Sequence, residues 1–440
     1  MSFCLLTGNG YVCGLQTQLY PPTMKDTIGN YRWRIVTLLL FATTINYIDR
    51  QILGILAPQL QSQFHWNESD YGFIIMAFQA AYAVGMLSVG SILDKIGTKT
   101  GYTVAVVLWS FAAMFHSVGR SIVSFAACRF LLGVGQSAHF PAAIKTVTEW
   151  FPKKERALAS GIFNAGSNVG AIITPLIVPA IAAIYGWQWA FIGTGALGFI
   201  WLLFWIPIYQ RPEINKHLTN RERDYILQDG VESTEKIPWR KIFPHKQTLG
   251  ICIARFLTDP IWWFFLFWLP KFLFSKFGID LSHIGLPLIV IYVVSIGGSI
   301  FGGWLSSHFI EKGNTPLAAR KRSIFLLALL VVPIFFASIT TSFWVAVALI
   351  SLAAFAHQGY AANIFTVVSD IYPKNAVGSM AGLAGFSGAV GGIFFSGAVG
   401  LILQLTGSYY IVFGIASVAY LLCWVSLKLF VPDDKAIEIK

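Results

Sequence analysis

A short polar stretch, Asn46-Tyr47-Ile48-Asp49-Arg50-Gln51, lies in the middle of an apolar run from about residue 35 to residue 60. That run is long enough to cross a bilayer, because a hydrocarbon core of roughly 30 Å takes about 20 apolar residues in a helix. A charge at that depth costs at least about 2.5–3.5 kcal/mol on insertion scales, so such residues usually face a partner or a water-filled cavity. The acid and the arginine could form a structural ion pair, or they could bind a charged substrate and carry a proton.

The composition is that of a membrane protein. The 440 residues are 56% hydrophobic and 12% charged, with a mean hydropathy of +0.65, whereas soluble domains carry about 25% charged residues. The five cysteines have no spacing typical of a metal site or a disulfide framework, so we expect no metal and no cofactor. Residues 1–28 do not form a secretory signal peptide. We interpret them as a disordered leader, with Met1 or Met24 as the start.

Twelve apolar runs predict an all-α membrane protein with twelve transmembrane helices. The first six are expected at residues 35–57, 72–93, 102–119, 121–147, 157–184 and 187–208. The second six are expected at residues 249–274, 284–309, 322–341, 343–369, 377–405 and 408–431. These runs predict an N-terminal six-helix bundle (29–208), a cytoplasmic linker (209–248), a C-terminal six-helix bundle (249–431) and a cytoplasmic tail (432–440). Within the linker, Thr219 and Glu222 predict a capping box that begins a short helix.

The basic residues indicate how the chain is oriented. If both termini lie on one side of the membrane, that side holds 24 of the 31 Lys and Arg residues and the other side holds two. An excess of Lys and Arg is typical of cytoplasmic loops, so both termini are expected in the cytoplasm. The net charge of +11 is therefore a sign of topology, and no nucleic-acid partner is expected.

The two halves of the chain repeat one another. Trp150-Phe151-Pro152-Lys153 corresponds to Ile371-Tyr372-Pro373-Lys374 at an offset of 221 residues, and Gly170 corresponds to Gly391 at the same offset. Repeats of this kind place a binding site at the interface of the two halves, near the middle of the bilayer.

A loop between the second and third spans contains Gly90, Asp94, Gly97 and Lys99 in the order G-x-x-x-D-x-x-G-x-K. Gly90 would allow helices to approach closely, Gly97 permits a turn, and Asp94 could cap the neighbouring helix. In a twelve-span chain this loop resembles the signature of the major facilitator superfamily. The resemblance implies that these four residues take part in gating. The corresponding loop of the second half lacks the acid and ends in Arg320-Lys321-Arg322.

Further motifs narrow the resemblance. In order, they are Asn46-Tyr47-x-Asp49-Arg50, Arg129-x-x-x-Gly133, Pro141-Ala142-Ala143-Ile144-Lys145, Glu149-Trp150-Phe151-Pro152, Phe163-Asn164-x-Gly166-Ser167, Arg255-Phe256-Leu257 and Phe355-Ala356-His357-Gln358. Together they resemble the anion:cation symporter family and its hexuronate-transporter branch. The resemblance extends from about Gly29 to the C-terminus. It implies import of a small organic anion, such as glucuronate or galacturonate, by proton symport with alternating access.

The resemblance also implies roles for individual side chains. Arg50 or Arg129 would bind the substrate carboxylate, since a guanidinium donates two parallel hydrogen bonds. The other expected substrate-binding residues are Tyr47, Tyr82, Gln136, Asn164, Ser167, His357 and Gln358. Each could instead form a hydrogen bond between helices. Arg255 and Asp259, spaced i,i+4, are expected to pair with each other.

Asp49 is the expected proton carrier, because burial raises and a neighbouring arginine lowers the pKa of a carboxyl group. Once protonated, Asp49 would free Arg50 or Arg129 for the incoming carboxylate. The position of Gln136 is commonly a glutamate in the family, and glutamine cannot release a proton. Three alternatives follow: Asp49 acts alone, His139 also takes part, or the protein is a proton-independent facilitator.

Other functions were weighed against transport. No GxSxG, HExxH or paired-carboxylate pattern supports an enzyme, and the 40-residue linker is short for the output domain of a sensor. A carrier of an aldonate, tartrate or an aromatic acid is the alternative among transporters. We expect a monomer in the bacterial inner membrane, with an organic anion, protons and the lipid bilayer as its partners.

Overall fold

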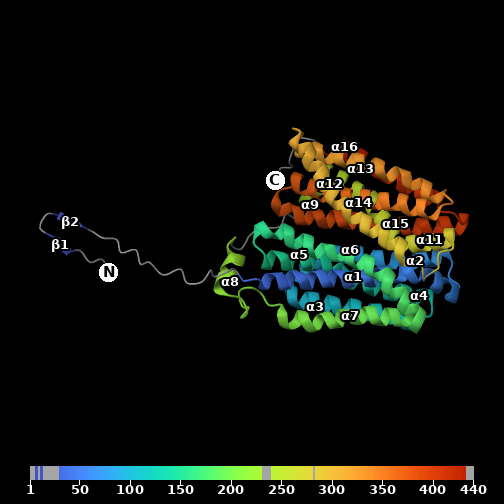
Figure 1. Cartoon of the computed structure of the whole chain (residues 1–440), viewed down its shortest axis with the longest axis horizontal. Coiled ribbons are helices and arrows are strands. Elements are labelled where there is room, and N and C mark those ends of the chain that lie inside the picture. The colour runs from blue at the N-terminus through green and yellow to red at the C-terminus, as the bar shows by residue number, and fades with distance from the viewer. Residues whose placement is uncertain (1–4, 8–9, 13–28, 230–238, 281–282, 433–440) are drawn as a thin grey trace.

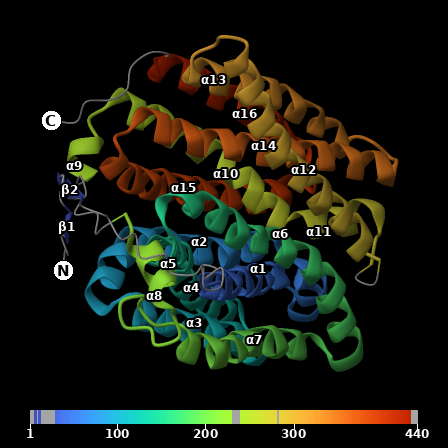
Figure 2. The same cartoon turned by 60° about the vertical axis from the view of Figure 1, so that its left-hand side comes forward.

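The computed structural model describes residues 5–7, 10–12, 29–229, 239–280 and 283–432. Long helices run side by side along one axis, and those of the second half lie against those of the first (Figure 1). Turning the molecule separates the two bundles, with α1–α7 in one and α10–α16 in the other (Figure 2). The described residues are therefore mainly helical, as the apolar runs predict.

The first bundle begins with α1, which carries the polar stretch in a single continuous helix. Its elements are α1 (Tyr31–Phe64), α2 (Glu68–Ile96), α3 (Thr98–Phe115), the 3₁₀ helix η1 (His116–Val118), α4 (Ile122–Ser137), α5 (His139–Trp150), α6 (Lys153–Tyr185) and α7 (Trp187–Ile208). The segment between the bundles contributes α8 (Asn220–Leu227) and α9 (Trp239–Ile242).

The second bundle repeats this plan. Its elements are α10 (Lys246–Phe267), α11 (Leu269–Phe277), α12 (Gly285–Glu311), α13 (Pro316–Val331), the 3₁₀ helix η2 (Val332–Ser338), α14 (Phe343–Ile371), α15 (Lys374–Thr406) and α16 (Tyr410–Phe430). In the leader, β1 (Leu5–Thr7) pairs antiparallel with β2 (Gly10–Val12). These six residues are paired strands, and most of the expected disordered leader lies outside the described residues.

Ten helices in the described part of the chain are long and apolar enough to cross a membrane. The two other expected spans correspond to α1, which carries Asp49 and Arg50, and to α4 followed by α5. A break at Ala138 divides that second span. Polar groups thus interrupt the apolar pattern in two spans of the first bundle.

The sequence repeat reappears in the helix boundaries. Both α6 and α15 contain 33 residues, and both begin directly after a proline, Pro152 or Pro373. Their first and last residues differ by the same 221 positions, as do the last residues of α5 and α14. Because proline favours the first turn of a helix, the repeated proline places the start of the fifth long helix identically in each half.

The helix α8 is held on the end of the first bundle by a buried charge. Thr219 caps it by accepting a hydrogen bond from the backbone N–H of Glu222, as expected. The expected capping box is wrong, however, because the Glu222 carboxylate accepts from the backbone N–H of Arg32 at 3.1 Å and from its Nη1 at 3.3 Å. Arg32 also pairs with Glu155 at 2.8 Å. The ionic contact with a buried arginine takes the carboxylate that the local box would have used.

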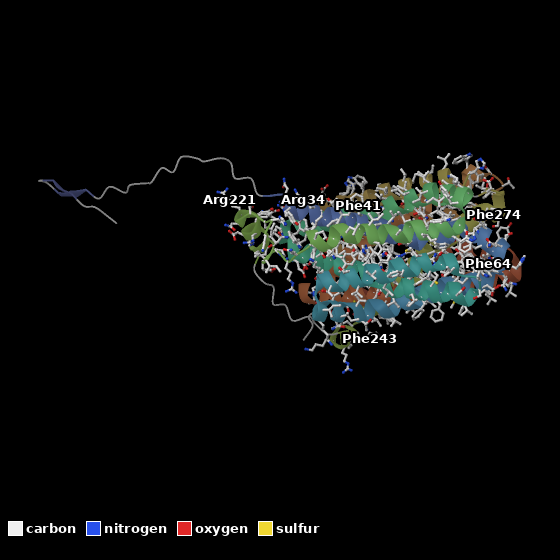
Figure 3. All side chains as sticks on the ribbon, turned by 90° about the horizontal axis from the view of Figure 1, so that it is seen from below. Arg34, Phe41, Phe64, Arg221, Phe243 and Phe274 are labelled. Carbon is white, nitrogen blue, oxygen red and sulfur yellow. The ribbon has the colours of Figure 1, made fainter. Side chains whose placement is uncertain are left out.

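The two ends of the molecule differ in character. Arg34 and Arg221 lie at one end, which we call the basic end, and Phe64 and Phe274 lie at the other, the far end (Figure 3). Phe41, which is 54% exposed, projects from the side of the bundle between them. Exposed aromatic and aliphatic side chains along the helices suit contact with lipid.

Candidate functional site

Arg50 lies in a cage of aromatic rings at the interface of the two bundles. Its Cζ atom is 4.9–5.4 Å from the centroids of four rings, contributed by α1, α2 and α10: Tyr47, Phe78, Tyr82 and Trp263. Only 3% of Arg50 is exposed. Each ring face attracts the guanidinium by about 0.5–2 kcal/mol. The cage therefore stabilises a buried cation without neutralising it.

Neutral groups also supply the hydrogen bonds of Arg50. Its Nε donates to Oε1 of Gln136 at 3.2 Å, and its Nη2 donates to Oδ1 of Asn46 at 3.0 Å. Gln136 in turn donates to the backbone oxygen of Asn46 at 3.1 Å. Among the described residues, no carboxylate lies within ion-pair distance of Arg50. A buried cation with no counter-charge is a receptor for an anion.

Asp49 faces away from Arg50, into the first bundle. It is 1% exposed and lies near Thr194 of α7 and Arg129 of α4. Neither carboxylate oxygen has a hydrogen-bond partner among the described residues, and no described ion pair joins Asp49 to either arginine. The structural ion pair considered for Asp49 and Arg50 is therefore absent from this part of the chain.

Arg129 supports the same region from behind. Its Nη1 donates to the backbone oxygen of Arg50 at 3.1 Å, while Nε and Nη2 have no partner among the described residues. Asp49 lies within electrostatic reach of Arg129. The two arginines therefore share one neighbourhood, but only Arg50 is enclosed by aromatic rings from both bundles.

His139 is held by hydroxyl groups on both ring nitrogens. Tyr102 lies 2.7 Å from Nδ1, and Thr43 lies 3.0 Å from Nε2. The Thr43 hydroxyl donates its hydrogen to the backbone oxygen of Leu39, so it accepts from Nε2–H, and Nδ1 accepts from Tyr102. This arrangement satisfies a neutral imidazole and leaves no acceptor for a second ring proton. The environment of His139 is therefore that of a structural residue linking α1, α3 and α5.

The other expected binding residues lie apart from the cage. On α6, Asn164 is exposed and Ser167 is buried, with its hydroxyl donating to the Asn164 backbone oxygen at 2.7 Å. On α14, His357 stacks on Trp262 with ring centroids 5.0 Å apart, and its Nδ1 meets the Tyr420 hydroxyl. Gln358 is partly buried on the same helix. Of the predicted set, the structure brings Tyr47, Arg50, Tyr82, Arg129 and Gln136 together.

Three residues of the cage and its hydrogen bonds were not predicted as site residues: Asn46, Phe78 and Trp263. Asn46 precedes Arg50 by four residues, one helical turn, so spacing could have identified it. Phe78 lies four residues before Tyr82 and could have been found in the same way. Trp263 comes from the other bundle, and no local pattern relates it to Arg50.

The loop between α2 and α3 forms an ion pair at the basic end. Asp94 accepts from Nζ of Lys145 on α5 at 2.7 Å, so it binds another helix and does not cap its neighbour. Gly97 has a φ of +82°, a conformation that favours glycine. The expectation for Gly90 is wrong here, because a Cβ at that position would meet no described atom within 4 Å. Lys99 is partly buried in the first turn of α3.

The end of α5 is fixed beside this loop. Glu149 accepts hydrogen bonds from the Thr98 hydroxyl at 2.7 Å and from the Tyr209 hydroxyl. Burial, followed by the charge of Glu149, raises the pKa of Tyr209 above its usual range, so Tyr209 remains a donor. In the second half, Asp370 lies 221 residues after Glu149 and pairs with Arg320 at 3.5 Å. Each half thus joins the same two regions, through different partners.

The two bundles are joined at the far end. Lys271 pairs with Glu68, whose backbone N–H donates to Gln404 at 3.2 Å. Deeper in, Tyr71 donates to the backbone oxygen of Phe267 at 2.6 Å. Gln51, one residue beyond Arg50, donates to the Tyr292 hydroxyl at 2.7 Å. Together these contacts, which we call the far-end seal, are the described hydrogen bonds and ion pairs that cross between bundles.

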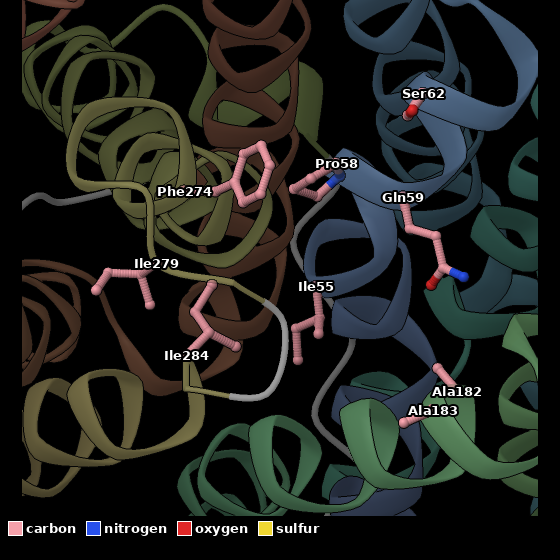
Figure 4. Close-up of a pocket in the computed structure, with 9 residues that line it drawn as sticks. All are labelled: Ile55, Pro58, Gln59, Ser62, Ala182, Ala183, Phe274, Ile279 and Ile284. Carbon is pink, nitrogen blue, oxygen red and sulfur yellow. The ribbon is translucent and has the colours of Figure 1, made fainter.

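A pocket of about 310 Å³ lies toward the far end, between α1, α6 and the segment around α11 (Figure 4). It is lined mainly by apolar side chains, including Ile55, Pro58, Phe274 and Ile284, with Gln59 and Ser62 as polar members. No charged residue lines it. It therefore lacks the cation that would bind an anion, and Arg50 remains the candidate site.

Comparison with known proteins gives a family and a fold. Residues 39–320 match the family model described as Major Facilitator Superfamily. The hexuronate transporter of Escherichia coli (strain K12) is 33% identical over 418 residues, covering 94% of this chain and 96% of that protein. The D-galactonate transporter of Escherichia coli O6:H1 is 30% identical over 390 residues, covering 86% and 90%. The crystal structure of a D-xylose-proton symporter superposes with a TM-score of 0.72 at 14% identity, covering 93% of this chain and 100% of that one.

The far-end seal generates a prediction for Glu68→Gln. This change leaves Lys271, whose side chain is 8% exposed, without a counter-charge, and an unpaired buried charge is costly. Opening between the bundles should therefore increase. In a Ser396→Cys background, a thiol that starts 3% exposed near Gly72, we expect labelling by a membrane-impermeant maleimide to become about tenfold faster.

The matched control is Glu213→Gln, which removes an exposed carboxylate from the segment after α7. Protein without the Ser396→Cys change measures labelling of the native thiols. Equal labelling rates in Glu68→Gln and Glu213→Gln would contradict the role given to the Lys271–Glu68 pair.

Proposed function

The chain belongs to the major facilitator superfamily, and we propose that it carries small sugar acids across a membrane, with hexuronates such as glucuronate and galacturonate as substrates. The single observation that supports an anionic substrate most directly is Arg50, a buried cation with neutral hydrogen-bond partners. The names of the hexuronate and D-galactonate transporters support a sugar acid. The protein is thus a multi-pass membrane transporter and not an enzyme.

In this proposal Arg50 binds the substrate carboxylate. A carboxylate accepts two parallel hydrogen bonds from a guanidinium, and it supplies the counter-charge that Asn46 and Gln136 do not. Tyr47 and Tyr82 flank the guanidinium and can exchange hydrogen bonds with sugar hydroxyls through their phenol groups. Arg129 has the role of fixing the backbone at Arg50 and adding positive charge behind it.

The more distant residues have weaker roles. Asn164, Ser167, His357 and Gln358 lie on α6 and α14, and we propose that they contact sugar hydroxyls in another stage of the transport cycle. The Ser167 hydroxyl and His357 Nδ1 already have protein partners. Substrate contact at these two atoms would therefore require their present hydrogen bonds to exchange.

Transport by alternating access fits the asymmetry of the two ends. The far-end seal closes one side, and we assign the basic end to the cytoplasm because Lys and Arg concentrate in cytoplasmic loops. The described state would then be the one from which substrate is released inward. Gating at the basic end falls to the loop of Gly90, Asp94, Gly97 and Lys99, through the Asp94–Lys145 pair. We place the protein, as a monomer, in a bacterial inner membrane.

Proton symport is proposed with Asp49 as the carrier. Its buried carboxylate faces Arg129 and has no hydrogen-bond partner among the described residues, so gain or loss of a proton changes the field at both arginines. His139 is a poorer carrier because both ring nitrogens are already satisfied. Gln136 keeps the alternative of a proton-independent facilitator open, and the D-galactonate relative keeps an aldonate open as substrate. Tartrate and aromatic acids are the remaining carboxylates.

The substrate prediction concerns uptake by purified protein in liposomes. We expect uptake of labelled glucuronate that saturates and that unlabelled galacturonate inhibits, because both present one carboxylate and a row of hydroxyls. A panel of galactonate, tartrate and benzoate tests the other carboxylates, and neutral glucose is the control. Inhibition by glucose as strong as that by glucuronate would contradict an anion site at Arg50.

The coupling prediction concerns Asp49→Asn. With an inward proton gradient, the unchanged protein should accumulate glucuronate above equilibrium, whereas the variant should exchange labelled for unlabelled glucuronate but not accumulate it. An amide cannot carry the proton, while substrate binding at Arg50 is left in place. Accumulation by the variant would remove Asp49 from the mechanism, and accumulation by neither protein would favour the facilitator.

A further inference from the structure

The ion pair of Arg255 and Asp259 on α10 is not used by the proposed transport mechanism. Nη2 of Arg255 lies 2.9 Å from Oδ2 of Asp259, and the side chains are 15% and 13% exposed. Nε of Arg255 has no partner among the described residues. The pair is thus largely buried, keeps a small accessible surface, and retains a free donor.

The position of the pair on α10 relates it directly to the cage around Arg50. Arg255, Asp259 and Trp263 are spaced by four residues, so they follow one face of the helix. Trp263 stacks on Arg50, with its ring centroid 5.2 Å from Cζ. Asp259 therefore lies one turn, about 6 Å along the axis, closer to the basic end than that contact. Asp259 also lies within electrostatic reach of Tyr47, whose ring belongs to the cage.

The neighbouring helix α15 leaves room for this carboxylate. A Cβ added at Gly388 would lie 2.7 Å from Cγ of Asp259, a distance that real Cβ contacts do not show. A Cβ at Gly391 would overlap the backbone of Phe256. The two glycines allow α10 and α15 to approach closely and keep Asp259 in its place. From the remaining side, Tyr360 and Tyr420 lie within electrostatic reach of Asp259.

We propose that Asp259 is the subsite of the second bundle that accepts hydrogen bonds from the hydroxyl end of a sugar acid whose carboxylate binds Arg50. This inference rests on the proposed function. A carboxylate is an acceptor of several hydrogen bonds, and those from hydroxyls to a charged group are strong. Arg255 is a positioning residue that keeps Asp259 charged and oriented. One turn of α10 separates the two subsites, a spacing that suits a six-carbon chain.

The subsite also determines specificity. A sugar acid with one carboxylate presents hydroxyls to Asp259, whereas a sugar diacid of the same length, such as glucarate, presents a second negative charge. Like charges at that distance repel in a buried site, so Asp259 rejects diacids. Because the ligand then touches both bundles, its binding links them across the interface.

The test is Asp259→Asn in the full-length protein, purified in detergent, with dissociation constants measured for glucuronate and glucarate by calorimetry. We expect glucuronate to bind about tenfold more weakly, since a charge-assisted acceptor is lost. Glucarate should bind at least tenfold more tightly, because the repulsion is removed and Arg255 becomes available to its second carboxylate. A purely structural role would change both constants in the same direction, and that result, or no change, would overturn the inference.

A second variant keeps the test decisive if Asp259→Asn fails to fold. Gly388→Ala should displace the carboxylate and weaken glucuronate binding, whereas Gly378→Ala on the same helix, where a Cβ meets no described atom within 4 Å, should not. Equal binding by the two glycine variants would overturn the inference. If the unchanged protein binds neither sugar acid, the proposed function fails; if it binds glucuronate and the variants behave alike, only the subsite fails.

Discussion

The structure depends on one unusual feature, a buried arginine whose charge is left without a counter-ion. Arg50 is 3% exposed, yet neutral amides accept its hydrogen bonds and ring faces surround it. Such a cation is costly in a membrane helix, and the surrounding structure limits that cost. Gln136 positions the guanidinium, Arg129 holds the backbone behind it, and Trp263 closes the cage from the second bundle. A bound carboxylate would complete the site.

The other polar groups have meaning in relation to this charge. Asp49 follows Tyr47 by two residues but points into the first bundle, so it modulates the field at Arg50 without neutralising it. Asp259 lies one turn along α10 from the cage and is already paired. The two carboxylates thus have distinct environments on the two sides of the interface. The far-end seal begins at Gln51, directly beside Arg50, which links occupancy of the site to contact between the bundles.

Much of the architecture follows from the sequence, because it depends on local patterns. Apolar runs predict the helices, and the repeat at 221 residues reappears in the bounds of α6 and α15. Contacts between distant segments were less predictable. Glu222 binds Arg32 and does not complete its local cap, and His139 shares hydroxyl partners with two helices far away in sequence. Trp263 reaches Arg50 only after the bundles assemble. Residues four apart on one helix could be inferred, whereas partners across the interface could not.

The central claim is that Arg50 binds a carboxylate through its planar fork, and Arg50→Lys tests it most directly. Lysine keeps the charge but cannot donate two parallel hydrogen bonds. The measurement is the dissociation constant for glucuronate of the purified protein, with Arg34→Lys, at an exposed arginine of the basic end, as the control. The account predicts binding at least about tenfold weaker in Arg50→Lys and unchanged in the control. Equal affinity in Arg50→Lys and the unchanged protein would contradict it.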